Sequence, residues 1–404
     1  MRLILVPLIV WLTLGPSPQV LVCAEPESLS PGVVTEELIL GYTLREWRER
    51  MKGLDPAGPE APQQVPALIQ LMQHESVPIF TRKQAALTLG RIGAPAVDAV
   101  PVLRATLQES DSTTTRLWVL KSLTLMGPPA APAAPDVAEL VRDPRQLHLI
   151  RSAGLEALGR MGPQHAHVMQ TLLTGARGDL PCHSEQGQQE LRMASIDVLG
   201  LLGPGAAPAI PALIRAAEAD WDLLRLSAVT TLGRIGPQAE IAIPTLVDVI
   251  GWDDAPEVRD AAATALASMG TLALPPFRQL VQDDDPQIRE RVLIGGVALG
   301  VQGRELLGEL LEDADLDLRI RAASALMRDA AQAELAAQVL LRSLPAASAR
   351  TQRTAYMALR DHPGTWSPDD DAFRTLLSHD DARIRELAKR LERERAGQQM
   401  EPPM

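Results

Sequence analysis

The stretch Leu89–Leu103, which reads LGRIGAPAVDAVPVL, decides the fold because the chain repeats it. Close copies begin at Leu158 (LGRMGPQ), Leu199 (LGLLGPGAAPAIPAL) and Leu232 (LGRIGPQAEIAIPTL). Self-similarity at a period of about 33 to 35 residues indicates a stacked array of one supersecondary unit. An array builds an extended surface, whereas a catalytic pocket depends on residues that occur only once.

A recurring arginine fixes the register, since it stands eleven residues before the second glycine of the clear copies. The series comprises Arg82, Arg116, Arg151, Arg192, Arg225, Arg259, Arg289 and Arg319. Its steps are 34, 35, 41, 33, 34, 30 and 30 residues, so the step of 41 indicates an insertion within residues 178–189. Because the arginine recurs in every copy, we interpret it as a structural residue that satisfies turn carboxylates or backbone carbonyls. An anion-binding track is the disfavoured alternative.

Each repeat reads as two helices joined by a turn. After Arg82, small and apolar residues recur at three- and four-residue steps, which is typical of the buried stripe of an amphipathic helix. Gly93 can take the left-handed conformation that ends a helix. A second helix is predicted over residues 96–107, with Pro101 in its first turns, where proline is tolerated.

The pattern Arg-x-x-Ala-Ala-x-x-Leu-Gly-x-Ile-Gly over residues 82–93, followed by alanine and proline turns, resembles a HEAT repeat. It is most similar to the short class that is also seen in phycobilisome-linker lyases. The resemblance covers residues 64–340 well, and it implies an all-α, right-handed α-solenoid of about nine or ten helix pairs. It also implies a ladder between the arginines and turn aspartates. These aspartates are Asp111, Asp253, Asp254, Asp283, Asp284, Asp285, Asp315 and Asp381.

The array predicts one continuous domain with short flanks. Residues 25–63 form a lead-in and a capping helix, because Thr43 and Glu46 have the spacing of a capping box. Residues 64–394 form the HEAT array, and residues 395–404 are expected to be a disordered tail.

Residues 1–24 are typical of a secretory signal peptide. A short basic start precedes an apolar run at residues 3–14, and Val22-Cys23-Ala24 places small residues before a cleavage point. The apolar run is too short for a comfortable membrane span. We therefore expect an exported protein, periplasmic or extracellular, with no membrane span after cleavage. A lipid anchor on Cys23 is the alternative.

Composition limits the partners. The formal net charge of −12 argues against nucleic acid and anionic membrane surfaces as main partners. After cleavage one cysteine, Cys182, remains, and a single thiol forms no internal disulfide.

The sequence offers weak signals for catalysis. A run of three aspartates at 283–285 suits helix capping better than calcium, because no glycine-centred calcium loop is present. HEAT-type hydroxylases carry several His-Glu pairs, whereas this chain has one, at His74. Cys182 and His183 are adjacent, a poor geometry for a nucleophile and its base. We predict no catalytic residue, no cofactor and no metal ligand.

The sequence therefore favours a non-enzymatic protein-binding scaffold that uses the concave face of the solenoid. A structural subunit of an envelope assembly is the alternative, and a lyase-like or hydroxylase-like HEAT enzyme is disfavoured. The candidate binding-surface residues are Trp118, Cys182 and His183, since aromatic side chains anchor interfaces and the insertion occurs once.

Overall fold

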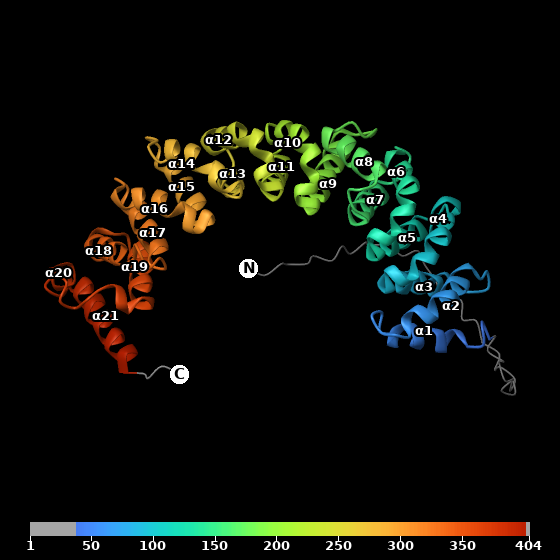
Figure 1. Ribbon diagram of the computed structural model, residues 1–404, viewed down its shortest axis with the longest axis horizontal. Helices are drawn as coiled ribbons and strands as arrows, with labels where there is room; N and C mark the ends of the chain where they lie inside the picture. Colours follow the sequence, from blue (N-terminus) through green and yellow to red (C-terminus); the bar gives the residue numbers. More distant parts are fainter. Residues whose placement is uncertain (1–37, 401–404) are drawn as a thin grey trace, which may run out of the picture.

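The chain folds into an arch of stacked helix pairs (Figure 1). The structure is a computed structural model that describes residues 38–400. The described residues contain no β-strand, and an isolated β-bridge joins Ile39 to Tyr42. The all-α solenoid expected from the repeat is confirmed, and the residues of the expected signal peptide lie outside the described part.

Two layers of helices form the arch (Figure 1). Helix α1 (Leu44–Gly53) precedes the first pair. The outer, convex layer contains α2 (Ala61–Gln73), α4 (Val100–Glu109), α6 (Ala134–Arg142), α8 (Ala166–Arg177), α10 (Ile210–Ala217), α12 (Ile243–Trp252), α14 (Leu274–Leu280), α16 (Arg304–Glu309), α18 (Ala333–Ser343) and α20 (Asp371–Leu377). The inner, concave layer contains α3 (Ile79–Ile92), α5 (Thr113–Met126), α7 (His148–Met161), α9 (Glu185–Leu202), α11 (Asp222–Ile235), α13 (Pro256–Ala267), α15 (Pro286–Leu299), α17 (Leu316–Leu326), α19 (Ala349–Asp361) and α21 (Ala382–Met400). The series of repeat arginines lies on the inner helices.

A glycine turn and a short 3-10 helix lead from an inner helix to the next outer helix in most repeats. Gly93 ends α3 with a positive φ of 72°, but its ψ of −129° lies outside the left-handed helical region that the sequence predicts. These segments are η1 (Ala94–Ala99), η2 (Pro128–Ala133), η3 (Gly203–Ala209), η4 (Gly236–Ala242), η5 (Gly270–Ala273), η6 (Gly300–Gly303) and η9 (Pro363–Thr365). Two more 3-10 segments, η7 (Leu310–Glu312) and η8 (Leu344–Ala346), instead follow the outer helices α16 and α18. The helix predicted over 96–107 is thus a 3-10 turn followed by α4, with Pro101 in its first turn.

The core is one continuous strip of buried alanine, leucine, valine and isoleucine that runs between the layers. Neighbouring inner helices pack closely, because small residues face the seam. A Cβ atom added at Gly90 of α3 would lie 2.6 Å from the backbone oxygen of Ser122 on α5. The Ser122 hydroxyl donates a 2.5 Å hydrogen bond to the carbonyl of Ala86 across the same seam. Each repeat is therefore held by contacts with its immediate neighbours.

Both ends of the array differ in detail from simple repeats. The capping box of α1 is confirmed: the Thr43 amide donates to the Glu46 carboxylate at 2.8 Å, and the Glu46 amide donates to the Thr43 hydroxyl at 3.2 Å. The expectation of a disordered tail from residue 395 is wrong up to residue 400, because α21 continues to Met400. Its charged residues at i and i+4, such as Arg390 and Glu394 at 3.0 Å, support the exposed helix.

The insertion before Arg192 is partly helical. Residues 178–184 form a loop, and the remainder lengthens α9 to 18 residues, against 14 in α3. Residues 185–217 contain an 18-residue window that is apolar enough by composition to cross a membrane, with a mean hydropathy of 1.4. Residues 185–217 comprise α9, η3 and α10, with a turn at Gly203, and half of that window is buried inside the solenoid. A buried core segment passes the same test of composition.

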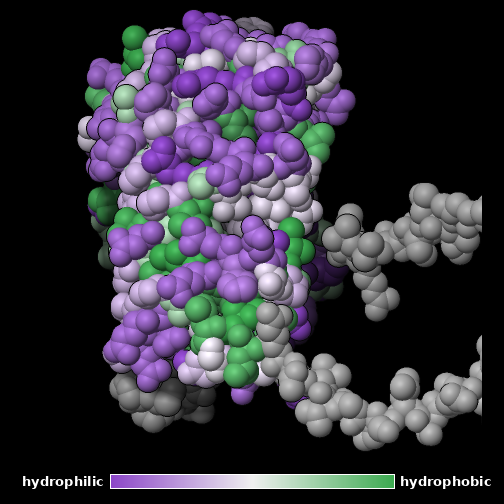
Figure 2. Space-filling view, turned by 90° about the vertical axis from the view of Figure 1, so that its right-hand side faces the viewer, coloured by the Kyte–Doolittle hydropathy of each residue, from purple (hydrophilic) through white to green (hydrophobic). Residues whose placement is uncertain are grey.

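The surface of the first repeats is uneven. Figure 2 faces the right-hand side of the arch, where hydrophilic residues cover most of the upper half and hydrophobic residues gather in the lower half.

Candidate functional site

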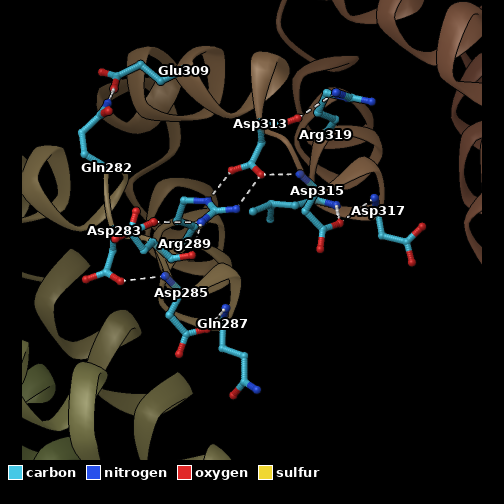
Figure 3. A network of polar contacts seen from close by, with 12 residues as sticks. Gln282, Asp283, Asp285, Gln287, Arg289, Glu309, Asp313, Asp315, Asp317 and Arg319 are labelled. Atoms are coloured by element: carbon cyan, nitrogen blue, oxygen red, sulfur yellow. Dashed lines mark hydrogen bonds and ion pairs between the residues drawn. The ribbon is translucent and has the colours of Figure 1, made fainter.

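The repeat arginines form a ladder that ties one repeat to the next. In Figure 3, the Arg289 guanidinium donates from Nε and Nη2 to the two carboxylate oxygens of Asp313, at 2.7 and 2.9 Å. Its Nη1 donates to the backbone carbonyls of Asp283 and Asp284, at 2.8 and 3.0 Å. The side chain thus closes the turn before its own helix and holds the turn of the following repeat.

Arg225 makes the same set of contacts with the carboxylate of Asp253, at 2.7 and 2.9 Å. Burial raises the pKa of the Asp253 carboxyl, but the hydrogen bonds from Arg225 and from the Ala255 amide outweigh burial and leave that pKa below its ordinary value. The pKa of the Asp313 carboxyl is lowered in the same way, because hydrogen bonds from Arg289 and from the Asp315 amide outweigh burial. Both carboxylates are therefore held ionised.

Other members of the series find backbone acceptors. Arg151, Arg192 and Arg319 donate to the carbonyls of residues 141, 176 and 313, at 2.7, 2.9 and 2.8 Å respectively. Arg116 donates to the Gln146 side chain at 2.9 Å. The side chains of Arg82 and Arg259 make no hydrogen bond or ion pair with the residues that the structure describes. The structural interpretation of the series fits the six arginines with partners.

The predicted aspartates divide into two roles. Asp253 binds the arginine of the preceding repeat, whereas Asp285 and Asp315 cap α15 and α17 by accepting from backbone amides at 2.8 Å. Sequence reasoning missed Asp313, although it stands two residues before Asp315 as Asp283 stands before Asp285. It also missed Arg385 of α21, which donates to the carbonyls of residues 379 and 380 at 2.5 and 2.7 Å.

The three candidate binding-surface residues are not brought together. Trp118 is wrong as a surface anchor, because this α5 residue is only 5% exposed and lines a pocket with residues of α2, α3 and α4. Cys182 is half-buried beside Gly187 and next to the buried Arg151, whose pKa is lowered by burial and raised in part by this neighbour. His183 is exposed on the insertion loop. Trp252, at the end of α12, is 84% exposed, although its place near a turn between helices favours partly buried packing.

A different surface emerges on the concave side of the first repeats. Large apolar side chains that face solvent recur on inner helices α3 to α11. They are Phe80, Leu125, Leu149, Leu201 and Leu223. A helix face that packs against nothing is expected to carry polar side chains, so a set of large apolar side chains there indicates a contact surface. We call this set the inner apolar surface.

Cations surround the N-terminal end of this surface. A groove of 570 Å³ lies between α1, α3 and α5, with Leu87 and Leu125 among its lining residues. Its other lining residues include the basic side chains Arg48, Lys52, Arg91 and Lys121. The groove therefore combines an apolar contact area with positive charge, although the whole chain is acidic.

The C-terminal half of the inner layer differs, since its charged side chains pair with one another. Arg291 of α15 lies 3.0 Å from the Asp260 carboxylate of α13, and Arg321 of α17 pairs with Glu290 of α15. The Thr351 hydroxyl of α19 donates to the Asp317 carboxylate at 2.7 Å. Ion pairs and hydrogen bonds of this kind link successive inner helices from α13 to α19.

Known proteins place the repeat in a family. A model of HEAT repeats matches residues 54–124, 184–267 and 219–298. This chain is a HEAT-repeat protein. No curated protein matches its sequence. Over the described residues, no group of three histidine, cysteine, aspartate or glutamate side chains is placed to hold a metal ion.

Solved structures with the same architecture include Kap121p. The HEAT-repeat chain is 13% identical to Kap121p, with a TM-score of 0.52, and the match covers 87% of this chain and 43% of that one. Kap121p bound to Pho4p gives 14% identity, a TM-score of 0.55 and the same coverage. The chain thus spans less than half the length of these structures, and at such identities the likeness shows the fold alone.

Proposed function

We propose that this HEAT-repeat protein is a non-enzymatic, exported scaffold that binds a protein partner along the concave face of its first five repeats, α2 to α11. The inner apolar surface carries the proposal, because its leucines lie exposed in the groove side of a solenoid, where partners of stacked repeats are accommodated. The basic side chains Arg48, Lys52, Arg91 and Lys121 beside it would select partners by charge.

Site-specific photocrosslinking tests which face binds. A benzophenone amino acid is placed at Leu149 or Leu223 on the concave face, and at Val97 or Ile241 in the outer turns as matched exposed controls. We expect one discrete crosslinked partner from the concave positions and none from the controls. Equal crosslinking from both faces would contradict the proposal.

Export rests on residues 1–24 and has its own test. Mass spectrometry of the protein isolated from its native cell should find a mature chain that begins at Glu25. A chain that retains Met1 would remove export from the proposal and leave the binding face untouched.

A further inference from the structure

One position on the inner helices alternates between arginine and leucine. The residue two before the turn glycine is Arg91, Leu125, Arg160, Leu201 and Arg234 in five consecutive repeats. We call these five residues the last-turn row. All are exposed, with Leu125 at 43% and Leu201 at 62%.

The row lies on the concave side of the inner layer. Each member stands nine residues after the repeat arginine of its helix, a rotation of about 180° at 100° per residue. It is thus turned away from the stripe that faces the outer layer. Arg91 and Leu125 both line the groove between α1, α3 and α5. Beyond the row, the same position holds Ser268 and Ala298, so the alternation is confined to the first five repeats.

The arginines of the row lack carboxylate partners. Arg91 donates to Thr88 of its own helix at 3.1 Å, while Arg160 and Arg234 make no side-chain hydrogen bond or ion pair within residues 38–397. Carboxylates on the same helices are engaged elsewhere: Glu156 lies 3.5 Å from Lys121, and Asp197 accepts a hydrogen bond from Ser227.

A structural role explains the three arginines of the row but not its two leucines. A cation in the last turn of a helix complements the partial negative charge of the terminal carbonyls, which accounts for the arginines. It does not account for Leu125 and Leu201, whose side chains remain 43% and 62% exposed. A surface in which charge and apolar area alternate at the repeat spacing is matched by a ligand with the opposite charge and the same spacing.

The spacing specifies the ligand. Packed helices are about 8–10 Å apart, and an extended chain advances about 3.3 Å per residue. One step along the row therefore corresponds to about three residues of an extended segment. We propose that the last-turn row binds an extended acidic segment of a protein partner, in which carboxylates and leucine-sized side chains alternate at about every third residue. This inference rests on the proposed function, since it names the chemistry of the partner on the same concave face.

Binding of synthetic peptides to the purified full chain tests the spacing. A fluorescent 13-residue peptide carries aspartate and leucine alternately at every third position, with serine and glycine between them. A second peptide has the same composition with the aspartates grouped at one end. Fluorescence anisotropy should show tighter binding of the alternating peptide, weakening as salt rises. Equal affinity of the two peptides would overturn the proposal.

Charge reversal tests the residues. The double variant R160E/R234E should bind the alternating peptide at least about tenfold more weakly, because two attractions become repulsions. R328E is the matched control, since Arg328 is exposed nine residues after Arg319 on α17, and it should change affinity less than about twofold. A peptide with lysines in place of aspartates should prefer the double variant. If the lysine peptide does not prefer R160E/R234E, and circular dichroism shows that the double variant is folded, the proposal is overturned.

Other occupants of the row are outcomes of the same experiment. If vesicles of anionic phospholipid compete with the peptide at equal salt, the row binds a membrane and the proposal is overturned. If the peptide binds more tightly after removal of residues 25–37, the row is occupied by the chain's own segment and the proposal is likewise overturned. If no peptide binds while the concave crosslinks to a protein partner persist, the acidic pattern is wrong and the proposed function stands.

Discussion

At the scale of single residues, the pair formed by Arg225 and Asp253 links two repeats. The Asp253 side chain is 4% exposed and accepts bonds from the guanidinium and from the Ala255 amide. Asp253→Asn should lower the free energy of unfolding by about 2–3 kcal/mol, as expected for hydrogen bonds to charged groups. Urea denaturation followed by circular dichroism measures it. The neighbouring, exposed Asp254→Asn is the control and should change stability by less than about 0.5 kcal/mol.

The same carboxylates predict a pH dependence. Because the pKa values of Asp253 and Asp313 are lower in the folded chain, their stabilisation is complete above the ordinary aspartate value, near about pH 4. It is lost as the pH falls through the folded values. The stability gap between the wild type and D253N/D313N should therefore be constant from about pH 7 to 5 and narrow below about pH 4. A gap that stays constant in acid would show that these carboxylates do not carry the stabilisation.

Sequence reasoning located the arginines but not all of their partners. The eleven-residue offset places every arginine of the series except Arg192 in the first turn of its inner helix, which is a local property. Its acceptor lies in another turn, 28 residues away for Arg225 and 24 for Arg289. Trp118 shows the same limit, because its position on a helix does not reveal whether its side chain is exposed until the neighbouring helices are placed against it.

At the scale of elements, the turn glycine separates the two layers. Gly236 has a φ of 73°, in a region that L-residues with a side chain rarely occupy, and it ends α11. Gly236→Ala should lower the free energy of unfolding by about 1–3 kcal/mol. Gly251 lies in α12 with open space around its Cα and an ordinary φ, so Gly251→Ala should raise stability by about 0.5–1 kcal/mol. Thermal melts of both variants measure the contrast, and destabilisation by both would contradict this account.

Helix existence was predictable from the sequence, and helix ends were less so. Proline and glycine offsets fixed the turns after Gly93 and Gly236, but the 3-10 segments between them depend on packing of the two layers. At the C-terminus, polar composition favoured a disordered tail after residue 394. The helix persists to Met400 because α21 already packs on the array through Ile384 and Leu391, and elongation of a formed helix requires no new nucleus.

At the scale of the whole molecule, repetition explains why the fold was predictable and the binding site was not. Every repeat shares its buried stripe, so the period identifies the architecture. The inner apolar surface and the last-turn row arise from residues that differ between repeats. The sequence contains Leu125 and Leu201 at equivalent positions, but it does not show that both side chains stay exposed or that Leu125 lines the groove between α1, α3 and α5.

A solenoid held by nearest-neighbour contacts should unfold locally when the packing of one helix pair is broken. Phe277 of α14 is fully buried, and its ring occupies the space beside Gly295 of α15. Phe277→Ala should lower the free energy of unfolding of the α14–α15 pair by about 3–5 kcal/mol. Hydrogen exchange measured by mass spectrometry should then show lost protection in α13 to α17 and unchanged protection in α3 to α7, because stability propagates only through adjacent repeats. Ile241→Ala, at an exposed side chain in η4, is the control and should leave exchange unchanged throughout. Uniform loss of protection in F277A would instead mean that the arch unfolds as one cooperative unit. The groove between α1, α3 and α5 would then depend on the distant C-terminal repeats for its stability.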